Sequence, residues 1–152
     1  MQVTPASPHD TADWLALRRQ LWPEASADEH RADIEKILAG AGRAVCLLAR
    51  SEGEAVAGFA EVTLRHDYVN GCSSSPVGFL EGLYVVPKAR RQAVARALVA
   101  AAEAWAAHHG CSEFASDVLV ENVESQKVHA ALGFSETDRV VYFHKSLGPR
   151  KG

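Results

Sequence analysis

Apolar residues recur along the chain with two different periods, and the changes between them predict alternating strands and helices. Repeats of three or four residues predict four helices, at about residues 8–21, 27–38, 91–109 and 122–132. Short, nearly continuous apolar runs predict six strands, at about residues 2–4, 43–50, 55–65, 77–86, 111–118 and 134–147. The order β-α-α-β-β-β-α-β-α-β combines hairpins with crossover connections. It predicts an α/β protein with a mixed sheet and helices on both faces.

Local signals support several of these boundaries. Ser26 is placed to cap the second helix, and Glu29, three residues later, completes a capping box. The pair Asn70-Gly71 lies in the polar stretch HDYVNGCSSSP and predicts a tight turn. Trp14 and Trp105 lie at helical spacing among apolar residues, so we expect both in the core.

Length and composition fit one domain spanning residues 1–152. The 152 residues include 47% hydrophobic and 23% charged residues, which is typical of a soluble globular protein. The formal net charge of −3 argues against a non-specific nucleic-acid binder. No apolar stretch approaches the ~20 residues of a membrane span, and the start MQVTPASPHD does not resemble a signal peptide. We therefore expect a cytoplasmic protein without a membrane or nucleic-acid partner.

Cysteine and histidine usage gives no sign of a disulfide framework or a metal site. The three cysteines, Cys46, Cys72 and Cys111, are far apart and odd in number, which predicts reduced thiols. Cys46 and Cys111 lie in apolar runs and are expected in the core. The seven histidines show no metal-ligand spacing, so we expect no metal.

The stretch FLEGLYVVPKARRQAVARAL, from Phe79 to Leu98, joins an apolar strand to a basic turn and a helix start. No acidic residue occurs from Pro87 through Ala102, so the helix lacks the acidic or hydroxyl cap that helix starts favour. Unpaired backbone N–H groups with cations nearby suit an anion such as a pyrophosphate. The alternative is a solvated basic turn with a poor cap, and the charge pattern alone favours neither.

RRQAVA, within this turn, resembles the coenzyme A pyrophosphate loop of the GCN5-related N-acetyltransferases, whose pattern is Q/R-x-x-G-x-G/A. Arg90 fits the first position and Ala95 the last, whereas Ala93 stands where the family usually has glycine. If Ala93 has helical dihedrals, its Cβ is tolerated; if the loop requires a positive φ, alanine is unsuitable.

Two further segments carry the same resemblance. LYVVP resembles the family's fourth strand, whose backbone pairs with the pantetheine arm, and ENVESQKVHAALGF resembles the segment N-x-x-S/A-x-x-x-Y-x-x-x-G-F, with His129 in place of the tyrosine. The resemblance implies a mostly antiparallel mixed sheet with acetyl-CoA between splayed strands 4 and 5, and an N–H near Leu83 holding the thioester oxygen. The implied acetyl-CoA contacts are Leu83, Tyr84, Val85, Arg90, Arg91, Gln92, Ala93, Val94, Ala95, Arg96, Asn122 and Ser125.

Within this family, QLWPE, RHDYVNGC, SSPVGFLEG, ASD and SQKVHAALGF resemble the chromosomal type of aminoglycoside 6′-N-acetyltransferases. This resemblance implies transfer of acetyl to a 6′-amine by direct attack in a ternary complex, antibiotic resistance and a homodimer. Two alternatives stay open. One is the same chemistry on another amine, such as a peptide or polyamine, and the other is a non-catalytic acyl-CoA-binding module.

Glu81 is the first candidate for catalysis, because a charge in mid-strand is rarely buried without a partner or a purpose. Side chains alternate along a strand, so Glu81 is expected on the same face as Leu83, where its carboxylate could accept the proton of an attacking amine. A salt-bridged surface glutamate is the alternative. Asp117 ends the next strand, where ligands of mixed sheets gather, and the resemblance makes it a substrate contact; otherwise it is a turn aspartate.

Four more residues are implied by the resemblance. Trp22 and Tyr68 are candidate walls for a sugar, since Tyr68 lies in a polar loop and Trp22 follows a helix; Trp22 could instead pack the helix end. Asp138, with Glu136 nearby, is a candidate substrate contact or a solvent-facing acid. His129 could protonate the leaving thiolate, or could serve packing or coenzyme binding.

Overall fold

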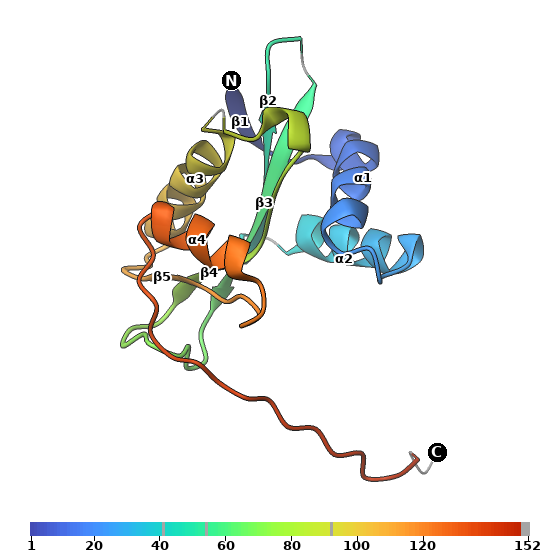
Figure 1. The fold of residues 1–152 in the computed structure, drawn as a ribbon. Coiled ribbons are helices and arrows are strands. Elements are labelled where there is room, and N and C mark those ends of the chain that lie inside the picture. The colour runs from blue at the N-terminus through green and yellow to red at the C-terminus, as the bar shows by residue number, and fades with distance from the viewer. Residues whose placement is uncertain (41, 54, 92, 150–152) are drawn as a thin grey trace.

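A five-stranded mixed sheet forms the centre of the computed structural model, which describes residues 1–40, 42–53, 55–91 and 93–149 (Figure 1). The strands lie in chain order, with the first four antiparallel and the last pair parallel. They are β1 (Gln2–Pro5), β2 (Ala44–Arg50), β3 (Val56–Arg65), β4 (Val77–Val85) and β5 (Phe114–Ser116). The mixed sheet predicted from the sequence is confirmed.

Helices cover both faces of this sheet (Figure 1). One face packs against α1 and α2, through a cluster that includes Trp14, Ile34 and Phe59. The opposite face packs against α3, through a cluster that includes Leu80 and Leu98. The helices are η1 (Pro8–Asp10), α1 (Thr11–Leu21), α2 (Ala27–Ala39), η2 (Pro87–Ala89), α3 (Val94–His108) and α4 (Val123–Ala131).

Most core expectations are confirmed, with one exception. Trp14 is fully buried, Trp105 packs at the edge of the α3 cluster, and the Ser26–Glu29 capping box is formed. Cys46 is buried, but Cys111 is only half-buried. The expectation for Cys111 was wrong because this residue follows Gly110, where the chain leaves α3, and β5 begins only at Phe114.

A β-bulge in β4 overturns the expected side-chain alternation. Glu61 of β3 pairs with Gly82 and Val62 pairs with Leu80, so Glu81 is the extra residue of β4. The Glu81 carboxylate accepts a hydrogen bond from Thr63, on the face covered by α1, whereas Leu83 packs into the α3 cluster. Glu81 and Leu83 therefore lie on opposite faces, because the bulge shifts the two-residue period by one.

The C-terminal expectation was also wrong, because residues 134–147 form no strand. Phe134 still packs on Phe114 of β5, but the following residues leave the body as an extended, exposed segment (Figure 1). An extended segment becomes a strand only where a neighbour accepts its backbone hydrogen bonds, and no strand of the described residues lies beside this one. Similarly, β5 has only three of the eight expected residues in register with β4.

Candidate active site

The candidate site lies where β4 and β5 part. The parallel pairing ends at Leu80 and Ser116, whereas β4 continues to Val85. Beyond Leu80, the edge of β4 that faces away from β3 has no strand partner in the described part of the chain. Backbone N–H and C=O groups on such an edge can pair with an extended ligand, as an added strand would.

Glu81 lies directly at this point and is held by two neighbours on β3. Its carboxylate oxygens lie 2.7 and 2.9 Å from Nη2 of Arg65, and one oxygen accepts a hydrogen bond of 3.1 Å from the Thr63 hydroxyl. The side chain is 28% exposed, so it remains open to solvent on one side. The salt-bridge partner expected in the alternative interpretation is present, and the partial exposure of Glu81 beside the strand edge leaves its catalytic role a prediction.

Trp22 forms a wall next to Glu81. The indole lies against Gly82, where a Cβ atom would come within 2.6 Å of the ring carbons Cη2 and Cζ2. Gly82 is thus required by a close approach between strand and ring. The ring also contacts Phe59 edge-on, at a centroid distance of 6.1 Å. Trp22 packs the end of α1 and borders the candidate site at the same time.

His129 approaches the same point from α4. Its Nδ1 lies 2.8 Å from the Ser125 carbonyl oxygen, and its Nε2 lies 2.8 Å from the Ser116 hydroxyl, which also lies 3.3 Å from the Leu80 carbonyl oxygen. A carbonyl only accepts, so Nδ1 carries a proton. In the neutral ring the Ser116 hydroxyl then donates to Nε2; in the protonated ring Nε2 donates to Ser116, which turns its own proton to Leu80.

The three remaining acceptor candidates are exposed. Asp117 follows Ser116 directly, just as Glu81 follows Leu80, so each residue comes directly after the last position paired between β4 and β5, at the point where the strands part. Tyr68 is 78% exposed in the loop after β3. Asp138 follows Thr137, which packs on Gly71 of that same loop. The structure thus brings Trp22, Glu81, Asp117 and His129 to the point where the strands part. It places Tyr68 on the loop after β3 and Asp138 on the C-terminal segment, which lies beside that loop at Thr137.

The start of α3 answers the question about Ala93. Ala93 is the N-cap residue and has a φ of +62°, and Arg91 has a φ of +65°, so both adopt the left-handed conformation. For alanine, the left-handed conformation costs roughly 1–2 kcal/mol relative to the right-handed one, whereas glycine adopts either without this cost. The helix begins at Val94 instead of Arg91 for this reason. Its first turn has neither an acidic residue nor a side-chain cap, as the sequence predicted.

Several residues implied by the resemblance make internal contacts. Nε of Arg90 donates to the Val85 carbonyl at 3.0 Å, and Nη2 of Arg96 donates to the Ala131 carbonyl at the end of α4. Asn122 caps α4 by accepting from the Ser125 amide. Gln92 lies outside the described residues. Arg90 and Arg96 therefore hold the loop from two sides, and both residues remain exposed.

Sequence reasoning missed Thr63, Arg65 and Ser116, which contact the candidate catalytic side chains. Alternation along β3 could have placed Thr63 and Arg65 on one face, but only the strand register shows that they lie beside Glu81. A hollow of about 730 Å³ lies elsewhere. It is lined by residues of β1, of the end of β2 and the turn after it, and of η1 and the start of α1, including Asp10, Asp13 and Arg50, and it carries none of the candidate residues.

Comparison with known protein families assigns this chain to one of them. The sequence profile of the Acetyltransferase (GNAT) family matches residues 11–134, which include α1 through α4. The chain belongs to this family. In a GNAT chain, the uncapped start of α3 and the free edge of β4 fit acetyl-CoA, since one offers N–H groups to a pyrophosphate and the other offers a backbone edge to an extended arm.

Individual relatives are similar along nearly the whole of this GNAT chain. The aminoglycoside N(6′)-acetyltransferase type 1 of Serratia marcescens is 53% identical over 141 residues, which are 92% of this chain and 96% of that protein. The crystal structure of the aminoglycoside antibiotic 6′-N-acetyltransferase AAC(6′)-IG from Acinetobacter haemolyticus has a TM-score of 0.92, at 44% identity, covering 97% of this chain and 100% of that one.

A third relative has been solved with a ligand. AAC(6′)-Iy, in complex with the bisubstrate analog CoA-S-monomethyl-acetylneamine, has a TM-score of 0.91 and 46% identity, covering 95% of this chain and 97% of that one. Its ligand joins coenzyme A to an aminoglycoside in one molecule. This chain therefore has the same fold as a protein whose structure contains that bisubstrate analog.

Proposed function

We propose that this protein transfers the acetyl group of acetyl-CoA to the 6′-amine of aminoglycoside antibiotics, and that this modification confers resistance. One observation carries the proposal. A carboxylate on β4, that of Glu81, lies where β4 and β5 part, in a GNAT chain that resembles aminoglycoside 6′-N-acetyltransferases over more than nine-tenths of its length.

Acetyl-CoA would bind along the free edge of β4 and at the start of α3. Leu83 to Val85 offer backbone groups to the pantetheine arm, and the first-turn N–H groups from Val94 to Arg96 offer donors to the pyrophosphate. The cationic side chains of Arg90, Arg91 and Arg96 surround this helix start. Asn122 and Ser125 would contribute from the start of α4, across the gap between β4 and β5.

The acceptor would bind on the α1 side of the same point. An aminoglycoside is a polycation, and Glu81 and Asp117 offer two carboxylates to its amines. Trp22 offers an aromatic face to a sugar ring. Tyr68 and Asp138 would close the outer end of the acceptor site from the loop and the C-terminal segment.

Direct attack accounts for the chemistry with these groups. The amine nitrogen forms a bond to the thioester carbonyl carbon, its proton passes to the Glu81 carboxylate, and the carbon–sulfur bond breaks. The leaving thiolate takes a proton from His129, relayed by the Ser116 hydroxyl. An acetylated cysteine is disfavoured, because burial raises the pKa of the Cys46, Cys72 and Cys111 thiols.

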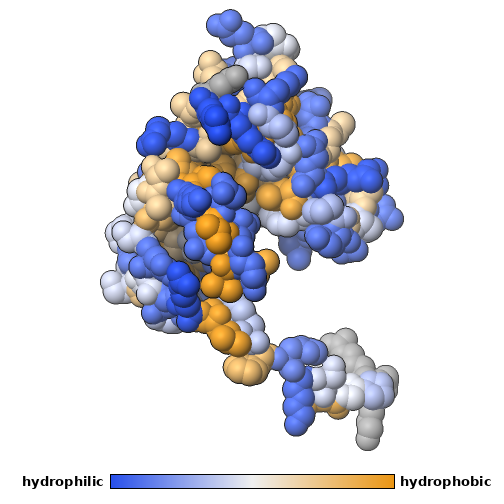
Figure 2. Space-filling model, in the orientation of Figure 1, coloured by the Kyte–Doolittle hydropathy of each residue, from blue (hydrophilic) through white to orange (hydrophobic). Residues whose placement is uncertain are grey.

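A homodimer is part of this proposal. Val141, Tyr142, Phe143 and Leu147 are 76–94% exposed on the C-terminal segment, which projects from the body (Figure 2). Apolar side chains exposed in a row mark a contact surface. The free edge of β5 on a second copy is the complementary partner, since it can accept an added strand.

Light scattering after size-exclusion chromatography tests this arrangement. The intact chain should elute with twice the chain mass, and the double variant Val141→Asp, Phe143→Asp should elute as a monomer. Lys145→Asp, in the same segment, is the control and should remain dimeric. A monomeric intact chain would contradict the homodimer.

The proposed location is the cytoplasm, consistent with the free cysteines. Among the described residues, no helix has the length and apolarity to cross a membrane.

The reaction is tested by release of coenzyme A thiol with three acceptors. A 6′-amino aminoglycoside should give rapid release, its 6′-hydroxy analogue little, and buffer alone the least. Equal release with both sugars would contradict the 6′-position. Absence of release with any amine would instead favour an acyl-CoA-binding module, and release with a peptide or polyamine alone would favour another acceptor.

A further inference from the structure

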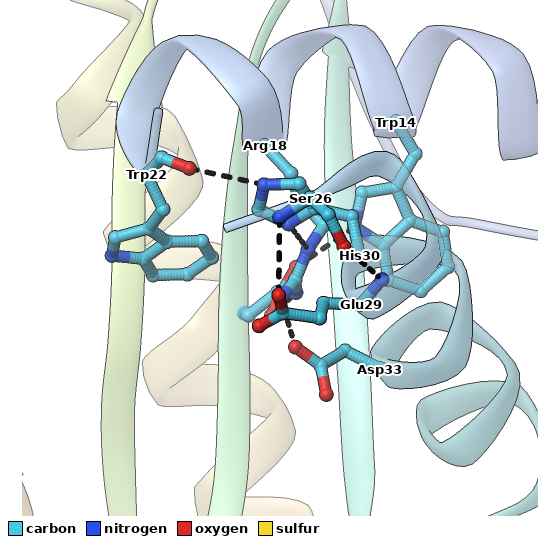
Figure 3. A network of polar contacts seen from close by, with 8 residues as sticks. Trp14, Arg18, Trp22, Ser26, Glu29, His30 and Asp33 are labelled. Carbon is cyan, nitrogen blue, oxygen red and sulfur yellow. Dashed lines mark hydrogen bonds and ion pairs between the residues drawn. The ribbon is translucent and has the colours of Figure 1, made fainter. Parts of the chain in front are cut away.

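A buried polar network lies beneath α1, next to the candidate acceptor site (Figure 3). At its centre is Arg18, which is 5% exposed. Its guanidinium donates to both carboxylate oxygens of Glu61 at 2.5 Å, to Asp33 at 2.7 Å and to Nδ1 of His30 at 3.1 Å. Glu61 also accepts from the indole N–H of Trp14 at 2.8 Å. None of these groups belongs to the catalytic arrangement described above.

His30 connects this network to Trp22. The imidazole is fully buried, and its Nδ1 accepts from Nε of Arg18, so the other ring nitrogen carries the proton. That nitrogen, Nε2, lies 3.0 Å from the Trp22 carbonyl oxygen and donates to it. Arg18 thus selects the tautomer of His30 that can hold the backbone of Trp22.

Arg18 also contacts the ring of the same tryptophan. Its guanidinium carbon lies over the Trp22 ring, 4.7 Å from the centroid, and the ring carbons Cη2 and Cζ2 lie against Gly82. Trp22 is the C-cap of α1, where the helix no longer constrains the chain, and its φ of −125° and ψ of 73° are not helical. At such a position, external contacts decide where the side chain points.

We propose that Arg18 and His30 are positioning residues for acceptor binding. Together they hold Trp22 over Gly82, one residue from Glu81, so that the indole presents a fixed wall to the sugar that carries the reacting amine. The role in acceptor binding rests on the proposed function. The expected consequence is selective: loss of this contact weakens acceptor binding and leaves acetyl-CoA binding unchanged, because the proposed acetyl-CoA site lies along the β4 edge and the start of α3, whereas the Trp22 cluster packs on the opposite face of the sheet from α3.

Two matched substitutions of His30 test the proposal. In His30→Gln the amide can replace Nε2 and still donate to Trp22, whereas in His30→Asn it replaces Nδ1 and keeps only the bond from Arg18. We expect the KM for the aminoglycoside to rise about tenfold in His30→Asn and to change by less than about threefold in His30→Gln. The KM for acetyl-CoA should stay within about twofold in both. Equal effects of the two substitutions would overturn the proposal.

A second measurement does not depend on turnover. In protein labelled with ¹⁵N-tryptophan, the indole resonance of Trp22, assigned with Trp22→Phe, should shift in His30→Asn and stay in place in His30→Gln. An unmoved resonance in His30→Asn would overturn the positioning role. If the wild type acetylates no aminoglycoside, the proposed function fails, and the indole resonances still decide whether His30 positions Trp22.

A third variant displaces the ring while the network stays intact. In Gly82→Ala the new Cβ would come within 2.6 Å of the indole, so the ring must move. The aminoglycoside KM should again rise about tenfold. A folded Gly82→Ala protein with an unchanged aminoglycoside KM would also overturn the proposal, even if His30→Asn does not fold.

Discussion

Glu61 and Glu81 lie on adjacent strands of one sheet, point to the same face and differ in almost everything else. Glu61 is 4% exposed and accepts hydrogen bonds from Arg18 and Trp14. Glu81 occupies a bulge, remains partly exposed and pairs with Arg65 at the surface. Burial raises the pKa of Glu61, and Arg18 and Trp14 oppose that shift.

The difference separates a structural carboxylate from a reactive one. All oxygens of Glu61 are used by neighbours that are themselves buried, so this residue has no capacity left for a substrate. Glu81 keeps solvent access, and the strand edge beside it is unpaired. Both residues interrupt apolar strands in the sequence, so mid-strand charge alone does not distinguish the two roles.

The largest expected effect is a difference in stability when glutamine replaces glutamate at each of the two positions. Glu61→Gln should lower the free energy of unfolding by about 3 kcal/mol, because it leaves the buried Arg18 charge without its main partner. Glu81→Gln is the matched control and should change stability by less than about 1 kcal/mol. Urea denaturation of both variants measures this difference. Equal stabilities would mean that the Arg18–Glu61 pair is not a structural element.

The turnover number should fall more strongly in Glu81→Gln than in Glu61→Gln. Glu81→Gln should reduce kcat at neutral pH by about 100-fold, because general-base catalysis contributes roughly that factor, equivalent to about 2.7 kcal/mol of barrier. Binding of acetyl-CoA, measured by calorimetry, should stay within about twofold. Glu81→Gln turning over at the wild-type rate would show that another group accepts the proton.

Ala93 is a position where backbone strain, and not an unpaired side chain, should lower the stability of the protein. Whereas every described polar side-chain atom that is buried has a partner, the loop before α3 contains a left-handed alanine. Ala93→Gly should therefore raise the free energy of unfolding by up to about 1 kcal/mol, since strain relief exceeds the added chain entropy. Ala100→Gly, at an exposed position inside α3, should lower it by about 1 kcal/mol. Thermal melts of both give the sign, and destabilisation by Ala93→Gly would contradict the strain.

Substitution of Arg65, the exposed partner of Glu81, gives the smallest expected effect. Arg65→Gln should change the free energy of unfolding by about 0.5 kcal/mol, because Arg65 is 43% exposed and its pair with Glu81 is screened by solvent. The change should shrink further in 1 M salt. Arg18→Gln is the buried counterpart, and its larger cost should persist in salt. A loss of several kcal/mol in Arg65→Gln would show that the Glu81 pair is structural too.

Much of the fold could be predicted because it depends on neighbours in sequence. The capping box at Ser26, the strand that contains Glu81 and the uncapped start of α3 follow from residues within one or two turns of each other. The resemblance to a known family extended these predictions to a candidate site. The mispredicted C-terminal strand has the right apolar composition, but strand formation requires a neighbouring strand, and among the described residues none pairs with this segment.

By itself, the sequence determined the periods of the helices and strands, the family motifs and the placement of Glu81 within an apolar strand. Only the tertiary structure decided what Glu81 and Glu61 do. Arg18 and Glu61 are 43 positions apart, and the bulge that turns Glu81 away from Leu83 exists only in the register between β3 and β4. Contacts of this kind depend on burial and strand pairing across the whole sheet, and no local pattern of residues encodes them.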